Sequence, residues 1–268
     1  MGMTPLILLA NDDGIHSPGL LAAAQVLCEI GELMIVAPAT QHTGMGRSIP
    51  KVEDGRITEE HLAVRCQEVP MYAITGSPAQ AVTYAVMALA PRRPALVVSG
   101  INYGENLGSS VTASGTVGAA LEAASYGIPA LAVSLETDQA FHFHHGEVDW
   151  AAAAHFTGIF ARKLLNKAMP FDVDLLKIDI PATATPATPW RVTRQSRQPY
   201  YVTLPLPERA SSGTLTDLPY GVEIDWLALE PDSDICAFAR DRIVAVTPMS
   251  LDLTSRVAGA AVEQLLRA

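Results

Sequence analysis

The sequence predicts an α/β fold: a three-layer, doubly wound and mainly parallel sheet that is Rossmann-like in outline. Short, continuous apolar runs recur along the chain, as expected of strands buried on both faces. Longer Ala- and Leu-rich segments with helical spacing separate them. The 268 residues are 49% hydrophobic and only 17% charged, which is enough apolar material for a sizeable core. We expect a single α/β domain spanning residues 1–268.

The predicted strands are short and mainly apolar; they are residues 6–9, 34–37, 96–99, 130–135 and 175–180. The predicted helices have amphipathic spacing; they are residues 20–30, 79–89, 117–126 and 148–168. Ser17-Pro18 and Ser77-Pro78 each offer a capping hydroxyl and a first-turn proline, and Gly31 and Gly127 are typical helix stops. The alternation indicates βαβ units, whose parallel strands are joined by helices.

The alternation fails over residues 181–232, where prolines recur and no helix can be placed. We predict an antiparallel β-hairpin excursion there, which serves either as an arm that packs on a partner subunit or as a plain surface hairpin. Helical spacing resumes over residues 251–266 and predicts a C-terminal helix. That helix packs either on its own core or across a dimer interface.

The net charge and the cysteines indicate which binding partners and metal sites the protein lacks and in which compartment it acts. A net charge of −10 disfavours binding to nucleic acid, which requires clustered Lys and Arg. Cys28, Cys66 and Cys236 are widely separated in apolar stretches, so we predict buried thiols rather than a disulfide or a zinc site, in a reducing compartment. The N-terminus lacks the pattern of a signal peptide, and no apolar run reaches the ~18 residues of a membrane span. We therefore expect a cytoplasmic protein.

The most informative loop follows the first strand, with the sequence Asn11-Asp12-Asp13-Gly14. Ligands of parallel α/β sheets bind beyond the carboxyl ends of the strands. Two adjacent carboxylates repel each other there, and a hard divalent cation relieves that repulsion. An ordinary turn that leads into a helix cap explains the same four residues equally simply.

Two later loops add polar groups at strand ends. Residues 37–48 carry hydroxyls, glycines and Arg47, whose guanidinium suits either a phosphate or solvent. Residues 99–108 supply Asn102, an amide oxygen for a metal, and lead to Ser114-Gly115-Thr116, a helix start that favours a bound phosphate. Neither a P-loop nor a Gly-x-Gly-x-x-Gly motif is present, and the histidines at 142, 144 and 145 are expected to be solvated.

Together, residues 7–19, 97–108 and 114–120 resemble the motifs of the survival protein SurE family, metal-dependent 5′/3′-nucleotidases, in the right order. The resemblance spans most of the chain and is poorest over residues 181–232. It implies hydrolysis of nucleoside 5′- and 3′-monophosphates to nucleoside and phosphate. It also implies one Mg²⁺ or Mn²⁺ per subunit and a homodimer or homotetramer.

The resemblance further implies a role for particular residues. The metal ligands are Asp12, Asp13, Thr43 and Asn102, and either Asp12 or Asp13 acts as the catalytic base. The phosphate site is lined by Asn11, Asn106, Ser114, Gly115 and Thr116. Thr43, Ala39 and Gln80 depart from the family pattern, which usually has a serine and two acidic residues there. A phosphatase for other monoesters or short polyphosphate, and a non-catalytic nucleotide-binding module, are the alternatives.

Overall fold

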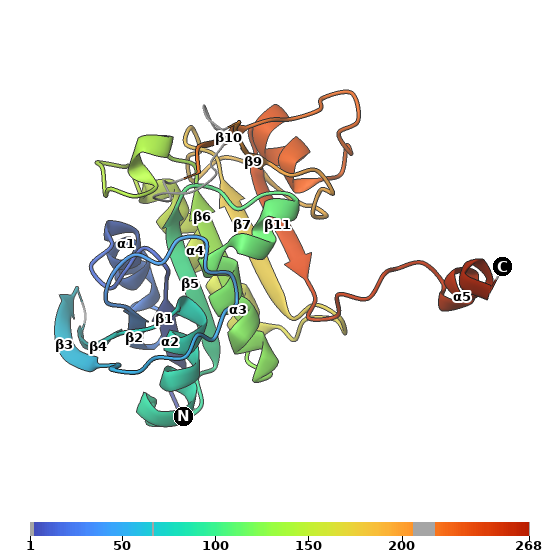
Figure 1. The fold of residues 1–268 in the computed structure, drawn as a ribbon. Coiled ribbons are helices and arrows are strands. Elements are labelled where there is room, and N and C mark those ends of the chain that lie inside the picture. Colours follow the sequence, from blue (N-terminus) through green and yellow to red (C-terminus); the bar gives the residue numbers. More distant parts are fainter. Residues whose placement is uncertain (1–2, 66, 206–217, 268) are drawn as a thin grey trace, which may run out of the picture.

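The computed structural model describes residues 3–65, 67–205 and 218–267. Its centre is a nine-stranded sheet with the order β3-β4-β2-β1-β5-β6-β7-β11-β8 (Figure 1). These strands are β1 (Leu6–Ala10), β2 (Glu32–Pro38), β3 (Ile57–Val64), β4 (Gln67–Ile74), β5 (Leu96–Tyr103), β6 (Ala130–Leu135), β7 (Leu175–Ile180), β8 (Trp190–Val192) and β11 (Val244–Met249). From β4 to β7 all neighbours are parallel. The predicted fold class is confirmed.

Helices cover both faces of the sheet and make the three layers. The helices α1 (Pro18–Leu27) and α4 (Ala151–Asn166) pack on one face, and α2 (Pro78–Tyr84) and α3 (Gly115–Ser125) pack on the other. The side chains of β1 alternate between the two hydrophobic layers, with Ile7 and Leu9 facing α1 and α4. Because both faces are covered, every residue of β1 is buried, which explains its uninterrupted apolar run.

The start of α2 shows how local chemistry sets a helix boundary. Ser77 and Gln80 form a reciprocal capping box, in which each side chain accepts a hydrogen bond from the other residue's backbone N–H. The Gln80 amide also donates to the Pro50 carbonyl at 2.6 Å, which anchors the preceding loop. A glutamine at this position therefore still caps the helix. The helix continues as a π-helical turn, Ala85–Leu89, so the predicted end at residue 89 is confirmed.

Four strands of the sheet, β3, β4, β8 and β11, are not among the five that were predicted. β3 is antiparallel to β4 at one edge, and β11 is antiparallel to β7 near the other. The side chains of β3 are mostly exposed, with only Val64 buried. An edge strand of this kind has no continuous apolar run, so a search for buried strands passes over it.

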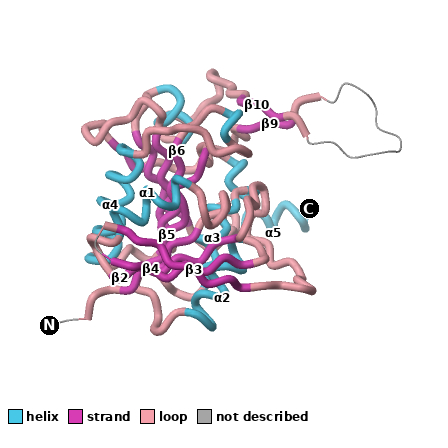
Figure 2. Tube along the Cα trace, turned by 90° about the vertical axis from the view of Figure 1, so that its left-hand side faces the viewer, coloured by secondary structure: helices cyan, strands magenta, loops and turns pink. Residues whose placement is uncertain are grey.

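The region predicted as an antiparallel excursion divides into two parts. The strands β9 (Tyr201–Thr203) and β10 (Tyr220–Val222) form a separate antiparallel pair at the upper end of the molecule, as predicted (Figure 2). β8 is different, because it joins the main sheet and runs parallel to β11. Residues 206–217 of the predicted excursion lie outside the described residues.

The C-terminal helix is shorter than predicted. Helix α5 (Gly259–Arg267) begins eight residues after the predicted start at residue 251. The preceding backbone is held in turns, since the Ser250 hydroxyl accepts from Asp252 N and the Asp252 carboxylate accepts from Thr254 N. None of the α5 residues is buried, and the helix lies apart from the sheet at the end of an extended segment (Figure 1). It does not pack on its own core.

Two further predictions concern burial and membranes. Cys28 and Cys236 are buried, as predicted, whereas Cys66 lies outside the described residues. Among the helices of the described ranges, none has the length and apolar character needed to cross a membrane.

Candidate active site

The acidic turn lies where the strand order of the sheet reverses. β1 lies between β2 and β5 and is parallel to both, so successive connections leave from it in opposite directions. This reversal opens a crevice at the carboxyl ends of the strands, where ligands of such sheets bind. Asp12 and Asp13 directly follow β1, and Asn102 and Tyr103 end β5.

Asp12 is buried, and its carboxylate receives hydrogen bonds from the start of α3. The Thr116 hydroxyl donates to Asp12 Oδ1, and the backbone amides of Gly115 and Thr116 help to stabilise the charged form. Burial nevertheless dominates and raises the pKa of Asp12 to about 6. The positive end of α3 thus faces a carboxylate that is partly protonated near neutral pH.

Asp13 is also buried, and it connects the acidic turn to the other two loops. Its Oδ2 accepts from Tyr103 N at 3.0 Å, and its Oδ1 lies 3.4 Å from Gln41 Nε2. The same Gln41 nitrogen donates to Thr43 Oγ1 at 2.9 Å. Burial and the neighbouring Asp12 carboxylate raise the pKa of Asp13 well above its usual value. Two adjacent carboxylates are therefore held together in a position that disfavours their charge.

The donor set fits a hard cation. The Asn102 amide nitrogen donates to the carbonyls of Tyr103 and Gly104, which directs its oxygen the other way. Within the described residues, no three His, Cys, Asp or Glu side chains converge as a metal cluster. A cation here would therefore rely on neutral oxygens, such as those of Thr43 and Asn102, beside the two carboxylates. An all-oxygen set of this kind suits Mg²⁺ or Mn²⁺.

The predicted phosphate-binding residues have different hydrogen-bond partners in the structure. Ser114 caps α3 by accepting from Val117 N at 3.1 Å. The Asn106 side chain donates to Ser134 Oγ at 2.7 Å. Asn11 is completely buried and its amide donates to the Gly14 carbonyl at 2.9 Å, so it closes the acidic turn. Its Oδ1 is buried and has no hydrogen-bond partner among the described residues, so its predicted role in the phosphate site stays a prediction.

Gly115 is required for the close approach of α3 to the acidic turn. A Cβ atom at this position would lie 2.7 Å from Asp12 Oδ2, closer than real contacts allow. We expect Gly115→Ala to displace the carboxylate and to lower kcat/KM for phosphate release by about 10²-fold, since small misplacements of catalytic groups have effects of this size. Gly259→Ala on α5 is the matched control, because its Cβ would meet open space. Equal kcat/KM in the two variants would contradict this role.

A cavity of about 500 Å³ is lined by Tyr103, whose backbone N–H binds Asp13, but neither Asp12 nor Asp13 is part of the lining. Four of the predicted site residues line it: Thr43, Asn102, Asn106 and Ser114. One part of the remaining lining, here called the aromatic wall, comes from the β9–β10 pair and the loop before α4; its residues are Tyr201, Tyr220, His142 and Phe143. No local sequence pattern predicts this wall, because its parts are far apart in the chain.

His142 corrects one expectation. It is buried rather than solvated, and its Nδ1 lies 2.9 Å from the Tyr220 hydroxyl oxygen. Its ring packs against Gly104, where a Cβ would lie 2.6 Å from His142 Nε2. Because burial disfavours the imidazolium, the pKa of His142 is lowered.

Three buried charged side chains form an ion triad that stabilises the loop carrying Asn106. Lys177 Nζ donates to Asp179 and, at 3.2 Å, to Asp234, and all three side chains are completely buried. Asp179 accepts from Asn106 N at 2.7 Å, and Asp234 accepts from Gly108 N at 3.1 Å. The triad therefore fixes the loop that carries Asn106.

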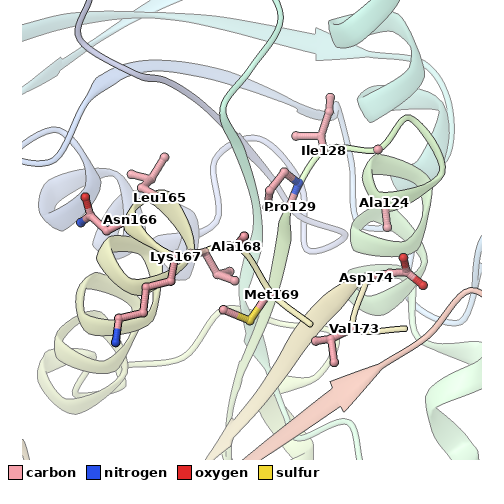
Figure 3. A pocket seen from close by; sticks show the side chains of 12 residues that line it. Ala124, Ile128, Pro129, Leu165, Asn166, Lys167, Ala168, Met169, Val173 and Asp174 are labelled. Carbon is pink, nitrogen blue, oxygen red and sulfur yellow. The ribbon is translucent and has the colours of Figure 1, made fainter. Parts of the chain in front are cut away.

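A second cavity, of about 470 Å³, lies at the other end of the strands, where β6 and β7 begin (Figure 3). It is lined mainly by apolar side chains from the ends of α3 and α4 and from the segment before β7. Its lining includes none of the predicted site residues. We therefore place the chemistry at the cavity beside the acidic turn.

Comparison with known proteins identifies the family. The model of the family described as survival protein SurE matches residues 7–202, which include the acidic turn, Asn102 and the start of α3. The chain belongs to the SurE family.

The chain is similar to SurE proteins over nearly its whole length. A protein of Methanocella arvoryzae named 5′-nucleotidase SurE is 40% identical over 273 residues, covering 99% of both chains. A protein of Thermococcus gammatolerans with the same name is 38% identical, covering 94% of this chain and 92% of the relative. The crystal structure of the SurE protein of Aquifex aeolicus matches with a TM-score of 0.74 and 28% identity, covering 98% of this chain and all of that one.

The structure also locates Arg47, the cation of the loop formed by residues 37–48. Its Nε donates to Glu122 Oε2 on α3 at 2.7 Å, and the other Glu122 oxygen accepts from Thr83 Oγ1 at 3.0 Å. Arg47 is not among the residues that line the cavity. It joins residues 37–48 to the two helices on that face and has no phosphate-facing geometry.

Proposed function

We propose that this protein is a metal-dependent 5′-nucleotidase that hydrolyses nucleoside monophosphates to nucleoside and inorganic phosphate. The observation that carries the proposal is the acidic turn itself. Two buried carboxylates, each with a raised pKa, meet the start of α3 beside a cavity with an aromatic wall. This arrangement is costly for folding and suits a site that takes up a cation and a phosphate.

Asp12, Asp13, Thr43 and Asn102 would hold one divalent metal, Mg²⁺ or Mn²⁺. When bound, the metal supplies positive charge that stabilises the phosphoryl oxygens. Ser114 and Asn106 orient the phosphate from the cavity wall, and the amides of Gly115 and Thr116 support the negative charge of Asp12. Either Asp12 or Asp13 would act as the base that takes the proton of the attacking water.

The aromatic wall favours the proposal that the leaving group is a nucleoside. Tyr201 and Tyr220 lie edge to face, with ring centroids 5.5 Å apart, on the side of the cavity formed by β9 and β10. Aromatic faces stack on bases with little regard to their identity. We therefore expect 5′- and 3′-monophosphates with several bases to be accepted, and ring-free monoesters to bind more weakly.

Assembly and location are part of the same proposal. Helix α5 exposes Leu265 and Leu266 at 76% and 80%, which is costly for a monomer. We propose that α5 and the β9–β10 pair pack on another subunit in a homodimer or homotetramer. Size-exclusion chromatography of the whole chain and of a chain ending at residue 250 tests this: loss of the larger species on truncation is expected. We also expect the protein to act in the cytoplasm.

Phosphate release from a panel of substrates tests the function. The panel contains nucleoside 5′- and 3′-monophosphates, sugar phosphates, glycerol phosphate and short polyphosphate, each with Mg²⁺, with Mn²⁺ and with chelator. The expected result is metal-dependent release that is fastest from nucleoside monophosphates. Fastest release from another substrate would favour a different phosphatase. Metal-independent nucleotide binding without release would indicate a non-catalytic binding module.

A further inference from the structure

Glu105 is a buried carboxyl group for which the proposed chemistry has no use. It lies in the loop between Asn102 and Asn106, is only 5% exposed, and is among the residues that line the cavity. Its Oε2 is buried and has no hydrogen-bond partner among the described residues. A buried carboxyl group with an unpaired oxygen is costly, so its presence beside a substrate cavity requires an explanation.

The other oxygen of Glu105 makes a well-formed bond to the aromatic wall, and the neighbouring Tyr200 hydroxyl also lowers the pKa of this carboxyl group. Tyr201 donates its hydroxyl to Glu105 Oε1 at 2.7 Å. Tyr201 in turn packs edge to face against Tyr220 and against His142, with ring centroids 5.5 and 5.8 Å apart. The ring that Glu105 holds is therefore at the centre of the aromatic wall.

The backbone of the wall is held separately. Ser110 Oγ accepts from Tyr200 N at 3.2 Å and from Tyr201 N at 3.3 Å, which fixes the start of β9 to the loop after Glu105. The backbone position of Tyr201 therefore does not depend on Glu105. What the bond from Tyr201 to Glu105 adds is the orientation of the ring.

The protonation state of Glu105 does not break this bond. Burial raises the pKa of Glu105 to about 7, so both forms are populated near neutral pH. A carboxylate oxygen and a carboxylic acid carbonyl oxygen both accept hydrogen bonds. Acceptance of the Tyr201 hydroxyl, rather than negative charge, is therefore the property of Glu105 that matters.

We propose that Glu105 is a positioning residue that orients Tyr201 and thereby the aromatic wall against which the nucleoside packs. This inference rests on the proposed function, because it assigns Glu105 a role in nucleotide affinity. It separates Glu105 from its neighbours in the loop, Asn102 and Asn106, which face the metal and the phosphate. Loss of the bond should affect binding of the nucleoside and leave the chemical step nearly unchanged.

Four variants test the proposal: Tyr201→Phe, Glu105→Leu, Glu105→Gln and the double variant Tyr201→Phe with Glu105→Leu. The readouts are kcat and KM for adenosine 5′-monophosphate and for glycerol phosphate, which has no ring, both with Mg²⁺. Tyr201→Phe and Glu105→Leu should each raise KM for the nucleotide by about 5- to 10-fold, the effect of one hydrogen bond, with kcat nearly constant. Glu105→Gln keeps an acceptor oxygen and should retain the wild-type KM.

Further comparisons separate positioning from a general structural effect. KM for glycerol phosphate should stay constant in all four variants, and the double variant should be no worse than either single one. Tyr72→Phe on β4 is the matched control, because its hydroxyl also donates to a glutamate, Glu59, at 3.3 Å, but outside the cavity. It should leave both substrates unaffected. If Glu105→Leu does not fold, Tyr201→Phe and Glu105→Gln still decide the question.

Several results would overturn the proposal. One is a rise in KM for the nucleotide in Glu105→Gln that equals the rise in Tyr201→Phe. It would indicate that the negative charge of Glu105 matters and not only its acceptor oxygen. Another is an equal loss of activity on both substrates, which would indicate a structural effect. Wild-type protein that releases phosphate from glycerol phosphate but not from the nucleotide would contradict the proposed function as well.

Discussion

Asp12→Asn is expected to lower kcat/KM for metal-dependent phosphate release from nucleoside monophosphates by about 10³-fold. The substitution keeps the size of the side chain and its ability to accept from the Thr116 hydroxyl, but it removes the negative charge. One of the two carboxylates that hold the cation is thereby lost. Activity is measured as phosphate release at several Mg²⁺ concentrations, and a sample with chelator gives the activity without metal.

The same variant should fold at least as well as the wild type without metal. Burial raises the pKa of both carboxyl groups, and the Asp12 charge raises that of Asp13 further, so removal of one charge relieves an unfavourable pair. Urea unfolding at pH 8 with chelator should give an unchanged or higher free energy of unfolding. Asp54→Asn, on the exposed surface, is the matched control for activity. Wild-type activity in Asp12→Asn would overturn the site assignment.

The second large effect is expected in stability. Lys177→Met should lower the free energy of unfolding by about 3–5 kcal/mol, because it leaves Asp179 and Asp234 buried without their cation. Activity should fall as well, since Asp179 holds the backbone of Asn106. Urea unfolding at pH 8, with chelator present, measures the first effect, and phosphate release measures the second.

The loss in Lys177→Met should depend on pH in a defined direction. Burial already raises the pKa of Asp179 to about 6 in the wild type, and removal of Lys177 raises it further. Acid therefore neutralises the unpaired Asp179 carboxylate, and the stability difference from the wild type should shrink between pH 8 and pH 5. Lys163→Met, on the exposed side of α4, should show neither the loss nor the pH dependence. A loss that stays the same at both pH values would contradict the unpaired-charge explanation.

The parallel centre of the fold could be predicted because its signals are local. β1, β2, β5, β6 and β7 are buried on both faces and are therefore mainly apolar, although Lys177 and Asp179 interrupt the apolar run of β7. β3 has one exposed face, and residues 250–258 are held by side-chain bonds from Ser250 and Asp252 that interrupt helical spacing. These features depend on the surrounding structure and not on local composition. The edge strand β3 and the start of α5 were therefore not predicted correctly.

The same distinction applies to the site. Asp12, Asp13 and Asn102 follow predicted strands, so the sequence places them at one edge of the sheet. Glu105 and Tyr201 are 96 residues apart, and Lys177 and Asp234 are 57 apart. Such pairs meet only because of the complete topology, which no local pattern encodes. The support of the site, unlike its ligands, therefore required the structure.

The central place of β1 also determines when the site can be completed during synthesis. Asp13 leaves the ribosome 90 residues before Tyr103, whose amide binds it, and Asp12 leaves 104 residues before Thr116. Until β5 is made, the nascent chain exposes an apolar strand with one edge unpaired. Pairing over such distances is slow, and unpaired apolar strands are prone to aggregate. We therefore expect this chain to be most prone to aggregation in the early stage of translation.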